Sequence, residues 1–341
     1  MAREHNCSAT PRPRVISRRA FLKLAAMAGL LAGCRPIRQL AATPTRPPVT
    51  RIRPDAPGKV VRARHAGVWD GDTLVPEAIR QMLDAAIRSL TGLDDANAAW
   101  AALFDPGERI AIKVNTIRES DFWTHVPLVM AVTECLQEAG VPADQIVIFD
   151  RLTRELENAG FPVNQDGPGV RCYGTEGDYT PGWTLLDTEV RLSDILLNCD
   201  ALINMPILKR HGISGLTFAM KNHYGTIDRP GRFHSNAEHA IPELNALPPI
   251  KERTRLIIGD ALTVCTRFWR SAVTGDSILM SFDPVAHDTV GLLVFGEALA
   301  SEGFSPGGET ALAARWLENG ARLGLGTNDP DSIKLVEVRL G

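Results

Sequence analysis

The sequence predicts an α/β protein with a mainly parallel β-sheet and helices on both of its faces. Short apolar runs, typical of buried strands, alternate along the chain with longer segments in which apolar residues recur at helical spacing. Polar side chains follow several of the apolar runs, and the carboxyl ends of parallel strands share the sheet edge where ligands bind. The 341 residues, with 44% hydrophobic composition and a formal net charge of -3, fit one globular domain over 60–341.

The first part of this domain predicts a βαβ unit. Strands are expected at 60–65, 109–114 and 145–149, and helices at 76–90 and 127–139. In the first helix Ile79, Leu83 and Ile87 fall on one face, and Pro76 suits the first turn. Strand, helix and strand in this order indicate parallel pairing.

Gly and Pro occur throughout region 150–195, which has no long period. We expect a short helix at Thr153–Asn158 and then a hairpin or variable excursion, which is a small insertion or a lid. Beyond this region, strands are expected at 201–208, 255–258, 277–282 and 333–339, and helices at 214–220, 285–299 and 309–323. Ser235 and Glu238 form a capping box that predicts another helix start, and Pro242 limits or kinks that helix.

The stretch 199–225 has the clearest functional pattern. A buried strand delivers the Lys-Arg-His sequence of 209–211 to a turn, and a second cluster, Lys-Asn-His at 221–223, follows soon after. Glycines at 212, 215 and 225 allow backbone to approach a ligand closely. Two such clusters around glycines at a strand end favour a ligand site over solvated surface charges.

Three segments resemble the bacterial and archaeal family named domain of unknown function 362. They are NMPILKRHGISGLTFAMKNHYG (204–225), IAIKVN (110–115) and DPVAHD (283–288). The resemblance extends over most of the chain from about Val60 to the C-terminus. The family is uncharacterised, and some members are joined to ferredoxin-like iron–sulfur domains. The resemblance therefore implies a grouping and no particular reaction.

The cysteines argue against a local metal cluster. The six cysteines, at 7, 34, 135, 172, 199 and 265, contain no C-x-x-C pair, so no iron–sulfur or zinc-ribbon motif is present. The last four have apolar neighbours and are expected to be buried free thiols. No run of Lys and Arg beside aromatic residues occurs in the body of the chain, so nucleic acid is not an expected partner.

The polar residues of the strand ends are candidates for a site. The candidate catalytic residues are Lys209, His211 and His223, and the candidate substrate-binding residues are Lys113, Asn115, Lys221 and Asn222. The three lysines would form a cationic cradle for a carboxylate or phosphate, so a small anionic ligand is expected. A histidine would transfer a proton.

A divalent metal is an additional option at this edge, although no cofactor can be named. The candidate metal ligands are Asp260, Asp283, His234 and His239. No H-x-x-x-H pair is present, so the fold would have to bring these residues together. Asp150 is interpreted as a turn residue, and His65, His125 and His287 as capping or surface groups.

The motifs of the common enzyme classes are absent from the sequence. It contains no G-x-S-x-G elbow, no G-x-x-x-x-G-K phosphate loop and no G-x-G-x-x-G turn. A serine hydrolase, a nucleotide hydrolase and an ordinary NAD enzyme are therefore disfavoured.

The N-terminal 1–34 segment has the pattern of an export signal. Arg18 and Arg19 lie in SRRAFLK, a twin-arginine motif read by the twin-arginine translocase, and the apolar run after it is too short to span a bilayer. The run ends in LAGC, which resembles a lipobox and makes Cys34 the expected lipidation site. The Pro-rich segment 35–59 is expected to be an extended tether. We expect a lipid-anchored protein on the extracytoplasmic face of a bacterial membrane.

Two functions from different classes remain open. One is an exported lipoprotein enzyme that acts on a small anionic metabolite by acid–base chemistry, with or without a metal. The other is a membrane-tethered binding protein for a metal, a cofactor or an anionic solute. A purely structural role ranks last because it needs none of the converging polar groups.

Overall fold

The computed structural model describes residues 57–117, 122–267, 271–305 and 307–341. The twin-arginine motif, the lipobox with Cys34 and nearly all of the tether lie outside the described residues. The described residues belong to one compact unit. Within these ranges, no helix combines the length and the apolar character needed to cross a bilayer.

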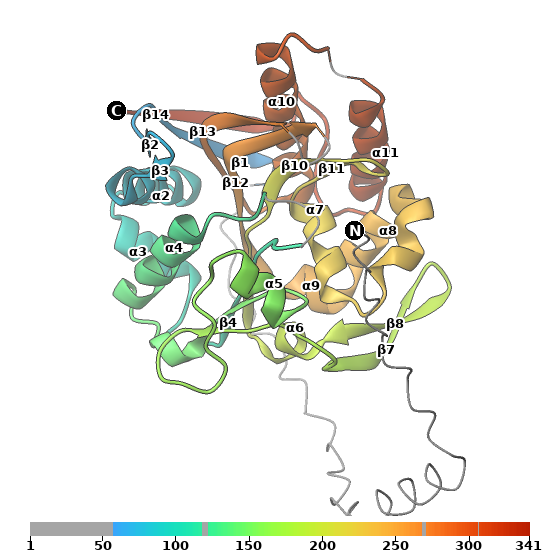
Figure 1. The fold of residues 1–341 in the computed structure, drawn as a ribbon, viewed down its shortest axis with the longest axis horizontal. Helices are drawn as coiled ribbons and strands as arrows, with labels where there is room; N and C mark the ends of the chain where they lie inside the picture. Colours follow the sequence, from blue (N-terminus) through green and yellow to red (C-terminus); the bar gives the residue numbers. More distant parts are fainter. Residues whose placement is uncertain (1–56, 118–121, 268–270, 306) are drawn as a thin grey trace, which may run out of the picture. The chain divides into compact units, whose positions relative to one another are not determined.

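A large twisted sheet forms the centre of the fold (Figure 1). Its strands are β1 (Lys59–His65), β4 (Ile110–Lys113), β5 (Ile146–Phe149), β6 (Arg171–Cys172), β9 (Ala201–Asn204), β10 (Ile207–His211), β11 (Gly215–Thr217), β12 (Thr254–Arg267), β13 (Ser271–Ser281) and β14 (Lys334–Leu340). Neighbouring strands follow the order β14-β1-β13-β12-β9-β4-β5-β6, and β10 and β11 continue from β12. β13 runs against β1 and β12, and β11 runs against β10, whereas the other pairs are parallel. The prediction of a mainly parallel sheet is confirmed.

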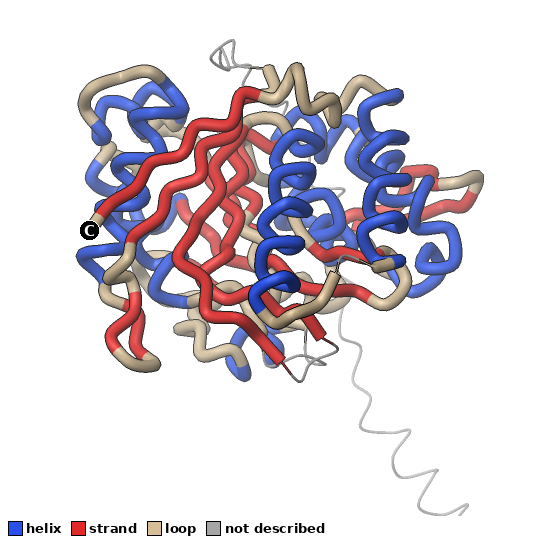
Figure 2. Tube along the Cα trace, turned by 90° about the horizontal axis from the view of Figure 1, so that it is seen from above, coloured by secondary structure: helices blue, strands red, loops and turns tan. Residues whose placement is uncertain are grey.

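Helices cover both faces of this sheet, as predicted (Figure 2). One face carries α2 (Pro76–Thr91), α3 (Ala96–Leu103), α4 (Val126–Glu138) and α5 (Thr153–Asn158). The other carries α6 (Asp194–Asn198), α7 (Ala219–Asn222), α8 (Ala237–Ala246), α9 (Pro248–Arg253), α10 (Pro284–Ser301) and α11 (Gly308–Arg322). Alternating strand residues serve the two cores, because Ile110 and Ile112 pack on the first face and Ala111 on the second.

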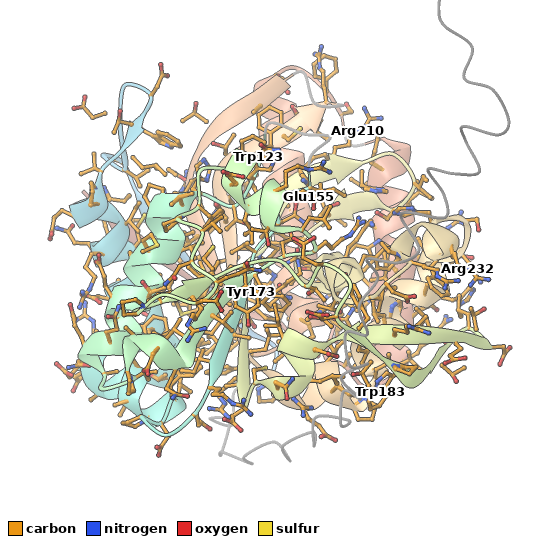
Figure 3. The ribbon with its side chains drawn as sticks, turned by 60° about the horizontal axis from the view of Figure 1, so that its bottom comes forward. Trp123, Glu155, Tyr173, Trp183, Arg210 and Arg232 are labelled. Carbon is orange, nitrogen blue, oxygen red and sulfur yellow. The ribbon has the colours of Figure 1, made fainter. Side chains whose placement is uncertain are left out.

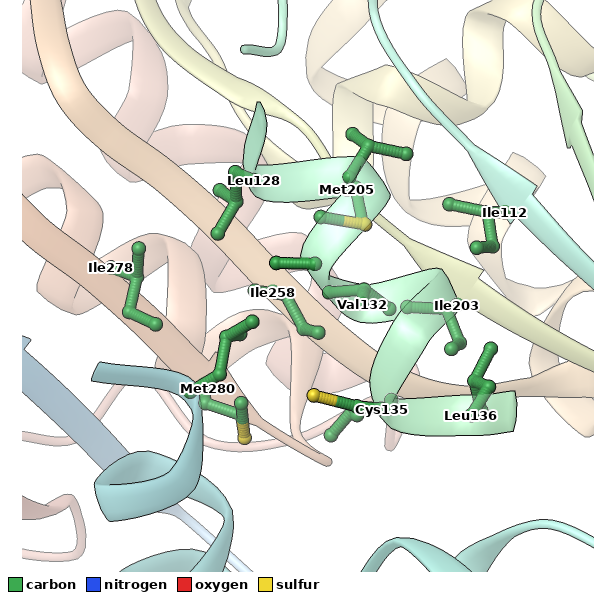
Figure 4. Packing of buried hydrophobic residues seen from close by; sticks show 14 of the residues in the cluster. Ile112, Leu128, Val132, Cys135, Leu136, Ile203, Met205, Ile258, Ile278 and Met280 are labelled. Carbon is green, nitrogen blue, oxygen red and sulfur yellow. The ribbon is translucent and has the colours of Figure 1, made fainter. Parts of the chain in front are cut away.

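In the first core, apolar residues at regular spacing along a helix pack against the sheet (Figure 4). In α4, Leu128, Val132 and Leu136 recur every four residues and so lie on one helix face against the sheet. Ile203 of β9 and Ile258 of β12 meet them from the sheet side. Each fully buried side chain of this size contributes about 1.5–3 kcal/mol relative to an exposed one.

Two segments of the central stretch differ from the expected elements. The single strand expected at 201–208 is split into β9 and β10 at Met205 and Pro206. Proline cannot donate a ladder hydrogen bond, and the ladder is interrupted there. β9 pairs with β4 and β12, whereas β10 pairs with β12 and β11. The helix expected at 214–220 is wrong: β11 precedes the four-residue α7. The chain then continues into 3-10 turns at His223–Thr226 and Pro230–Asn236.

The end of β12 and the start of α8 also differ from the boundaries expected from the sequence. β12 does not end near Asp260 but continues to Arg267 in a long hairpin with β13. Ser235 is not the cap of α8, because that helix starts at Ala237 after Asn236 and has no side-chain cap.

Region 150–195 contains the expected short helix α5 and hairpin. The hairpin is formed by β7 (Tyr179–Leu185) and β8 (Thr188–Ser193), which make a small sheet of their own. Its inward residues, Leu185, Val190 and Leu192, belong to the second core. A second small hairpin, β2 (Trp69–Asp70) and β3 (Thr73–Leu74), precedes α2. Action of the region as a lid stays a prediction.

The prediction of buried free thiols is confirmed for the four described cysteines. Cys135, Cys172, Cys199 and Cys265 are buried and free. Burial raises the pKa of Cys199 to about 12, so its thiol stays protonated.

Candidate functional site

A pocket of about 660 Å³ lies at the carboxyl ends of β4, β5 and β10, facing α7 and the turns after it. Seven cationic side chains and three carboxylates line it. They are Lys113, Arg151, Lys209, Arg210, Lys221, Arg229 and Arg232, and Asp150, Glu155 and Asp228. Figure 3 labels Glu155, Arg210 and Arg232, which reach the pocket from α5, β10 and the turn at 230–236. The excess of positive charge suits an anionic ligand.

Six of the seven predicted catalytic and substrate-binding residues line this one pocket. They are Lys113, Asn115, Lys209, His211, Lys221 and Asn222. The parallel strand directions explain the convergence, because Lys113 ends β4 and the Lys-Arg-His sequence of 209–211 ends β10 at the same sheet edge.

Lys113 and Asp150 form a buried ion pair in the pocket wall. Lys113 Nζ donates to Asp150 Oδ1 and to the Val114 carbonyl oxygen at 2.7 Å each, and to Asn222 Oδ1 at 3.5 Å. Burial lowers the pKa of Lys113 from its ordinary value and Asp150 opposes this effect. Because three oxygen acceptors match the three donors of an ammonium group, Lys113 is charged at neutral pH.

Asp150 is therefore more than the turn residue expected from the sequence, because it pairs with Lys113 and also binds Thr116. Its Oδ2 accepts from Thr116 N at 2.7 Å and from Thr116 Oγ1 at 3.0 Å, which ties the chain after β4 to the end of β5. A Cβ atom at Gly225 would lie 2.5 Å from Lys113 Nζ and 2.8 Å from Asp150 Oδ1. The glycine at 225 thus lets the turn after α7 pack against this ion pair, and it also lines the pocket.

Three amides connect β4, β9 and α7 beneath the pocket. Asn222 Oδ1 accepts from Asn115 Nδ2 at 3.0 Å, and Asn222 Nδ2 donates to Asn204 Oδ1 at 2.8 Å. Asn115 Oδ1 is buried and has no hydrogen-bond partner within the described ranges. A pocket-lining acceptor in this state is suited to a donor group of a ligand.

His223 does not line the pocket, unlike the other predicted catalytic residues. It is 1% exposed, and its Nε2 lies 3.2 Å from Asn204 Nδ2, so Nε2 is the acceptor. Burial, and then the charge of Lys113, lowers the pKa of His223 to about 3. The structure gives it a supporting position under the amides, which does not favour the predicted proton transfer to a ligand.

Lys209 and Lys221 are two further buried lysines of the pocket. Burial lowers the pKa of Lys209 to about 8, and burial followed by the charge of Lys209 lowers the pKa of Lys221 to about 7. Lys221 Nζ lies 4.0 Å from the ring centroid of Tyr224 and 3.4 Å from His234 Nε2. Burial and then Lys221 lower the pKa of His234 to about 4, so the ring is neutral.

His211 is held in one tautomer by the turn after β10. Its Nδ1 accepts from the backbone N–H groups of Ile213 and Ser214, both at 3.2 Å. Because backbone N–H groups only donate, the ring proton resides on Nε2. Burial and then Lys221 lower the pKa of His211 to about 2. His211 is therefore a neutral hydrogen-bond donor and a poor base, which changes the role expected from the sequence.

The four candidate metal ligands are not brought together. His234 lines the pocket, whereas Asp283 is the N-cap of α10 and accepts from Val285 N and Ala286 N. His239 is half exposed and lies 3.5 Å from Glu238. In the described parts of the chain, no three His, Cys, Asp or Glu side chains are grouped as metal ligands. The proposed ligand set is corrected for this reason: its members serve separate elements.

Asp260 is fully buried and lines neither the lysine pocket nor a second pocket, although its partner His125 lines the second one. Its Oδ2 accepts from His125 N and His125 Nδ1, both at 2.8 Å, at the start of α4. Burial alone would lower the pKa of His125, but the Asp260 carboxylate outweighs this effect, so the pKa is raised. His125, with Trp69 and Trp123, lines this second pocket of about 670 Å³. His125 occupies the N-cap position of α4, but its side chain makes no capping hydrogen bond and its ring contacts Asp260 instead.

Asp288 fixes the short helix that carries Lys221 and Asn222. Its carboxylate accepts from Ala219 N at 2.9 Å and Met220 N at 2.8 Å, and from His287 Nδ1 at 2.8 Å. All three donors and the acceptor are buried. α10 thereby positions α7 against the pocket, a link across the chain that the sequence pattern did not reveal.

The fold and the site together define an α/β protein with a buried, cation-rich pocket at the carboxyl edge of its sheet. The family model of the domain of unknown function DUF362 matches residues 110–292, more than half of the chain. The chain belongs to this family, which confirms the resemblance seen in the sequence. No curated protein matches the sequence.

Two solved structures are distantly similar. The lactate racemase apoprotein from Thermoanaerobacterium thermosaccharolyticum has 10% identity and a TM-score of 0.39, and the match covers 70% of this chain and 57% of that one. A structural-genomics protein from Thermotoga maritima has 13% identity and a TM-score of 0.37, with 69% and 60% covered. This chain thus spans less than two thirds of either protein.

Proposed function

We propose that the protein is an enzyme that acts on a small anionic metabolite in the pocket between β10 and α7. The observation that carries this proposal is the buried pair Lys209 and Lys221, whose lowered pKa values lie near neutrality. Such groups both attract an anion and exchange protons at neutral pH, which are two properties of catalytic sites.

The protonation state of each pocket residue determines the role that we assign to it. Lys209, with the higher pKa of the two lysines, binds the anionic group as an ammonium ion. Neutral Lys221 accepts a proton, and His211 donates a hydrogen bond through Nε2 to an oxygen of the ligand. Lys113 and Asp150 maintain the wall, and Asn115 Oδ1 offers an acceptor.

Thermal shift measurements with oxalate, pyruvate and inorganic phosphate test the anion site. We expect at least one of these anions to raise the melting temperature of the wild type. Lys209→Met should weaken its affinity by about 10- to 100-fold, since one charge-assisted contact is lost. Lys334→Met, which removes an exposed lysine on β14, is the matched control and should bind like the wild type.

The same samples separate an enzyme from a binding protein. Proton NMR of the bound anion, and of metabolites related to it, detects turnover or exchange of carbon-bound protons in heavy water. Binding without turnover would support the tethered binding protein. The anion site itself is contradicted if none of the anions stabilises the wild type, or if Lys209→Met binds unchanged.

We also propose, from the sequence alone, that the protein is exported by the twin-arginine translocase and anchored through Cys34. In cells, Arg18→Lys with Arg19→Lys should keep the protein in the cytoplasm. Cys34→Ala should release the exported protein from membranes and abolish incorporation of labelled palmitate. Membrane association that persists unchanged in Cys34→Ala would refute the lipid anchor.

A further inference from the structure

Lys221 is a buried lysine without a carboxylate partner. It is 6% exposed and reaches the pocket from α7. Among the described residues it forms no ion pair, whereas Lys113 is paired with Asp150 at 2.7 Å. An unpaired ammonium group is costly to bury, so this position favours the neutral amine, the nucleophilic form of lysine.

The neighbours of Lys221 also suit an amine. Its Nζ lies 3.4 Å from Nε2 of His234, which exchanges a hydrogen bond with an amine without adding charge. The Tyr224 ring, whose centroid is 4.0 Å away, attracts the ammonium form, but this attraction is smaller than the cost of burying an unpaired charge. Burial first, and then the charge of Lys209, lowers the pKa of Lys221 to about 7, so much of it is neutral near neutral pH.

We propose that Lys221 is a nucleophile that forms an imine with the carbonyl group of a small 2-oxo acid, an inference that rests on the proposed anion site. Lys209 and the arginines of the pocket hold the carboxylate next to the carbonyl group. A lysine desolvated beside a second cation is the arrangement that activates amines for this chemistry.

The reaction balances within the pocket. The Lys221 nitrogen forms a bond to the carbonyl carbon, and the carbonyl electron pair moves to oxygen, which takes up the proton lost by nitrogen. The hydroxyl group of this carbinolamine then leaves as water with a second proton. The ammonium group of Lys209, with a pKa of about 8, can supply that proton, and His211 Nε2 can hydrogen-bond the oxygen. These steps give one water and one protonated imine, with Lys209 left as the amine. Return of the proton from the imine nitrogen to Lys209 gives the neutral imine.

Borohydride trapping with pyruvate tests the inference on the full-length protein. We expect a single reduced adduct in the intact mass and a missed tryptic cleavage that maps it to Lys221. Oxalate, which has carboxylates but no ketone or aldehyde carbonyl, should compete and suppress the adduct. Lys221→Arg, which keeps a long basic side chain but has no nucleophilic amine, and Lys221→Met should lower labelling by about tenfold or more. Lys334→Met should label like the wild type.

The outcomes distinguish this inference from the anion site beneath it. Stabilisation by oxalate with no pyruvate adduct on Lys221 of the wild type would overturn the imine and leave the anion site standing. An adduct on Lys209, or equal labelling of exposed lysines, would overturn the assignment to Lys221. Absence of both stabilisation and adduct would defeat both proposals. Mapping the wild type makes the result independent of whether each variant folds.

Discussion

Lys113→Met is expected to lower the free energy of unfolding by about 3–5 kcal/mol, the usual cost of removing one partner of a buried ion pair. Lys113 is 1% exposed and Asp150 is 3% exposed, so water cannot replace the lost ammonium group. Methionine keeps most of the side-chain volume, and the loss therefore reports the uncompensated Asp150 carboxylate rather than a cavity. Urea denaturation measures the change.

A double-mutant cycle isolates the pair. Asp150→Asn should also destabilise the protein, whereas adding it to Lys113→Met should recover part of the loss, because no buried charge then remains. Lys334→Met, an exposed control, should change stability by less than about 0.5 kcal/mol. A loss below about 1 kcal/mol for Lys113→Met would show that the ion pair is not the structural centre of the pocket wall.

Asp288→Ala is expected to lower the free energy of unfolding by about 2–4 kcal/mol and to weaken anion binding. The substitution leaves the buried N–H groups of Ala219 and Met220 without their carboxylate acceptor. Since α7 carries Lys221, its displacement should reach the pocket even though Asp288 itself does not line it. Urea denaturation and the affinity for the best-binding test anion provide the two measurements.

Asp288→Asn serves as the graded comparison. Its amide oxygen can still accept from one of the two N–H groups, so its stability should lie between those of the wild type and Asp288→Ala. Full stability of Asp288→Ala would mean that α7 is held by its apolar contacts alone. Loss of stability with unchanged anion affinity would show that α7 keeps its place without the carboxylate.

The sequence predicted well where one local period dominates. The recurrence of Leu128, Val132 and Leu136 marked α4, and the short helix at Thr153–Asn158 has the predicted ends. α3 was missed because its sequence, ANAAWAAL, is apolar on most sides and has little amphipathic contrast.

Errors arose where tertiary pairing overrode local pattern. A continuous apolar run concealed the break at Met205 and Pro206, since burial on both sides of the break keeps the composition uniform. β12 passes through Asp260 because β13 pairs with it along its length. A polar residue after an apolar run therefore marked a strand end for Asp150 but an internal strand position for Asp260.

The candidate site could be predicted as a set of residue types but not as a set of roles. Lys209, His211 and Lys221 were found because they cluster around glycines in the sequence. Whether a histidine is a base or a donor depends on partners such as Ile213 N and Ser214 N, which only the folded turn supplies. The pairing of Asp150 with Lys113 joins residues 37 positions apart and left no local signal.

The central claim is that an anion binds against lysines that are only partly protonated. Titration calorimetry with oxalate at about pH 8, in buffers of different ionisation enthalpy, tests it most directly. Oxalate is a dianion there, and its two carboxylates raise the pKa of Lys209 and Lys221 from about 8 and about 7, so both take up protons. The single carboxylate of a 2-oxo acid pairs with Lys209 and leaves Lys221 as the amine. His211 and His234, with pKa values of about 2 and about 4, stay neutral.

The account predicts net uptake of up to about one proton or slightly more per bound oxalate, and a smaller uptake in Lys209→Met. Lys334→Met should match the wild type. Oxalate binding with an enthalpy independent of the buffer, or uptake that is unchanged in Lys209→Met, would contradict the claim.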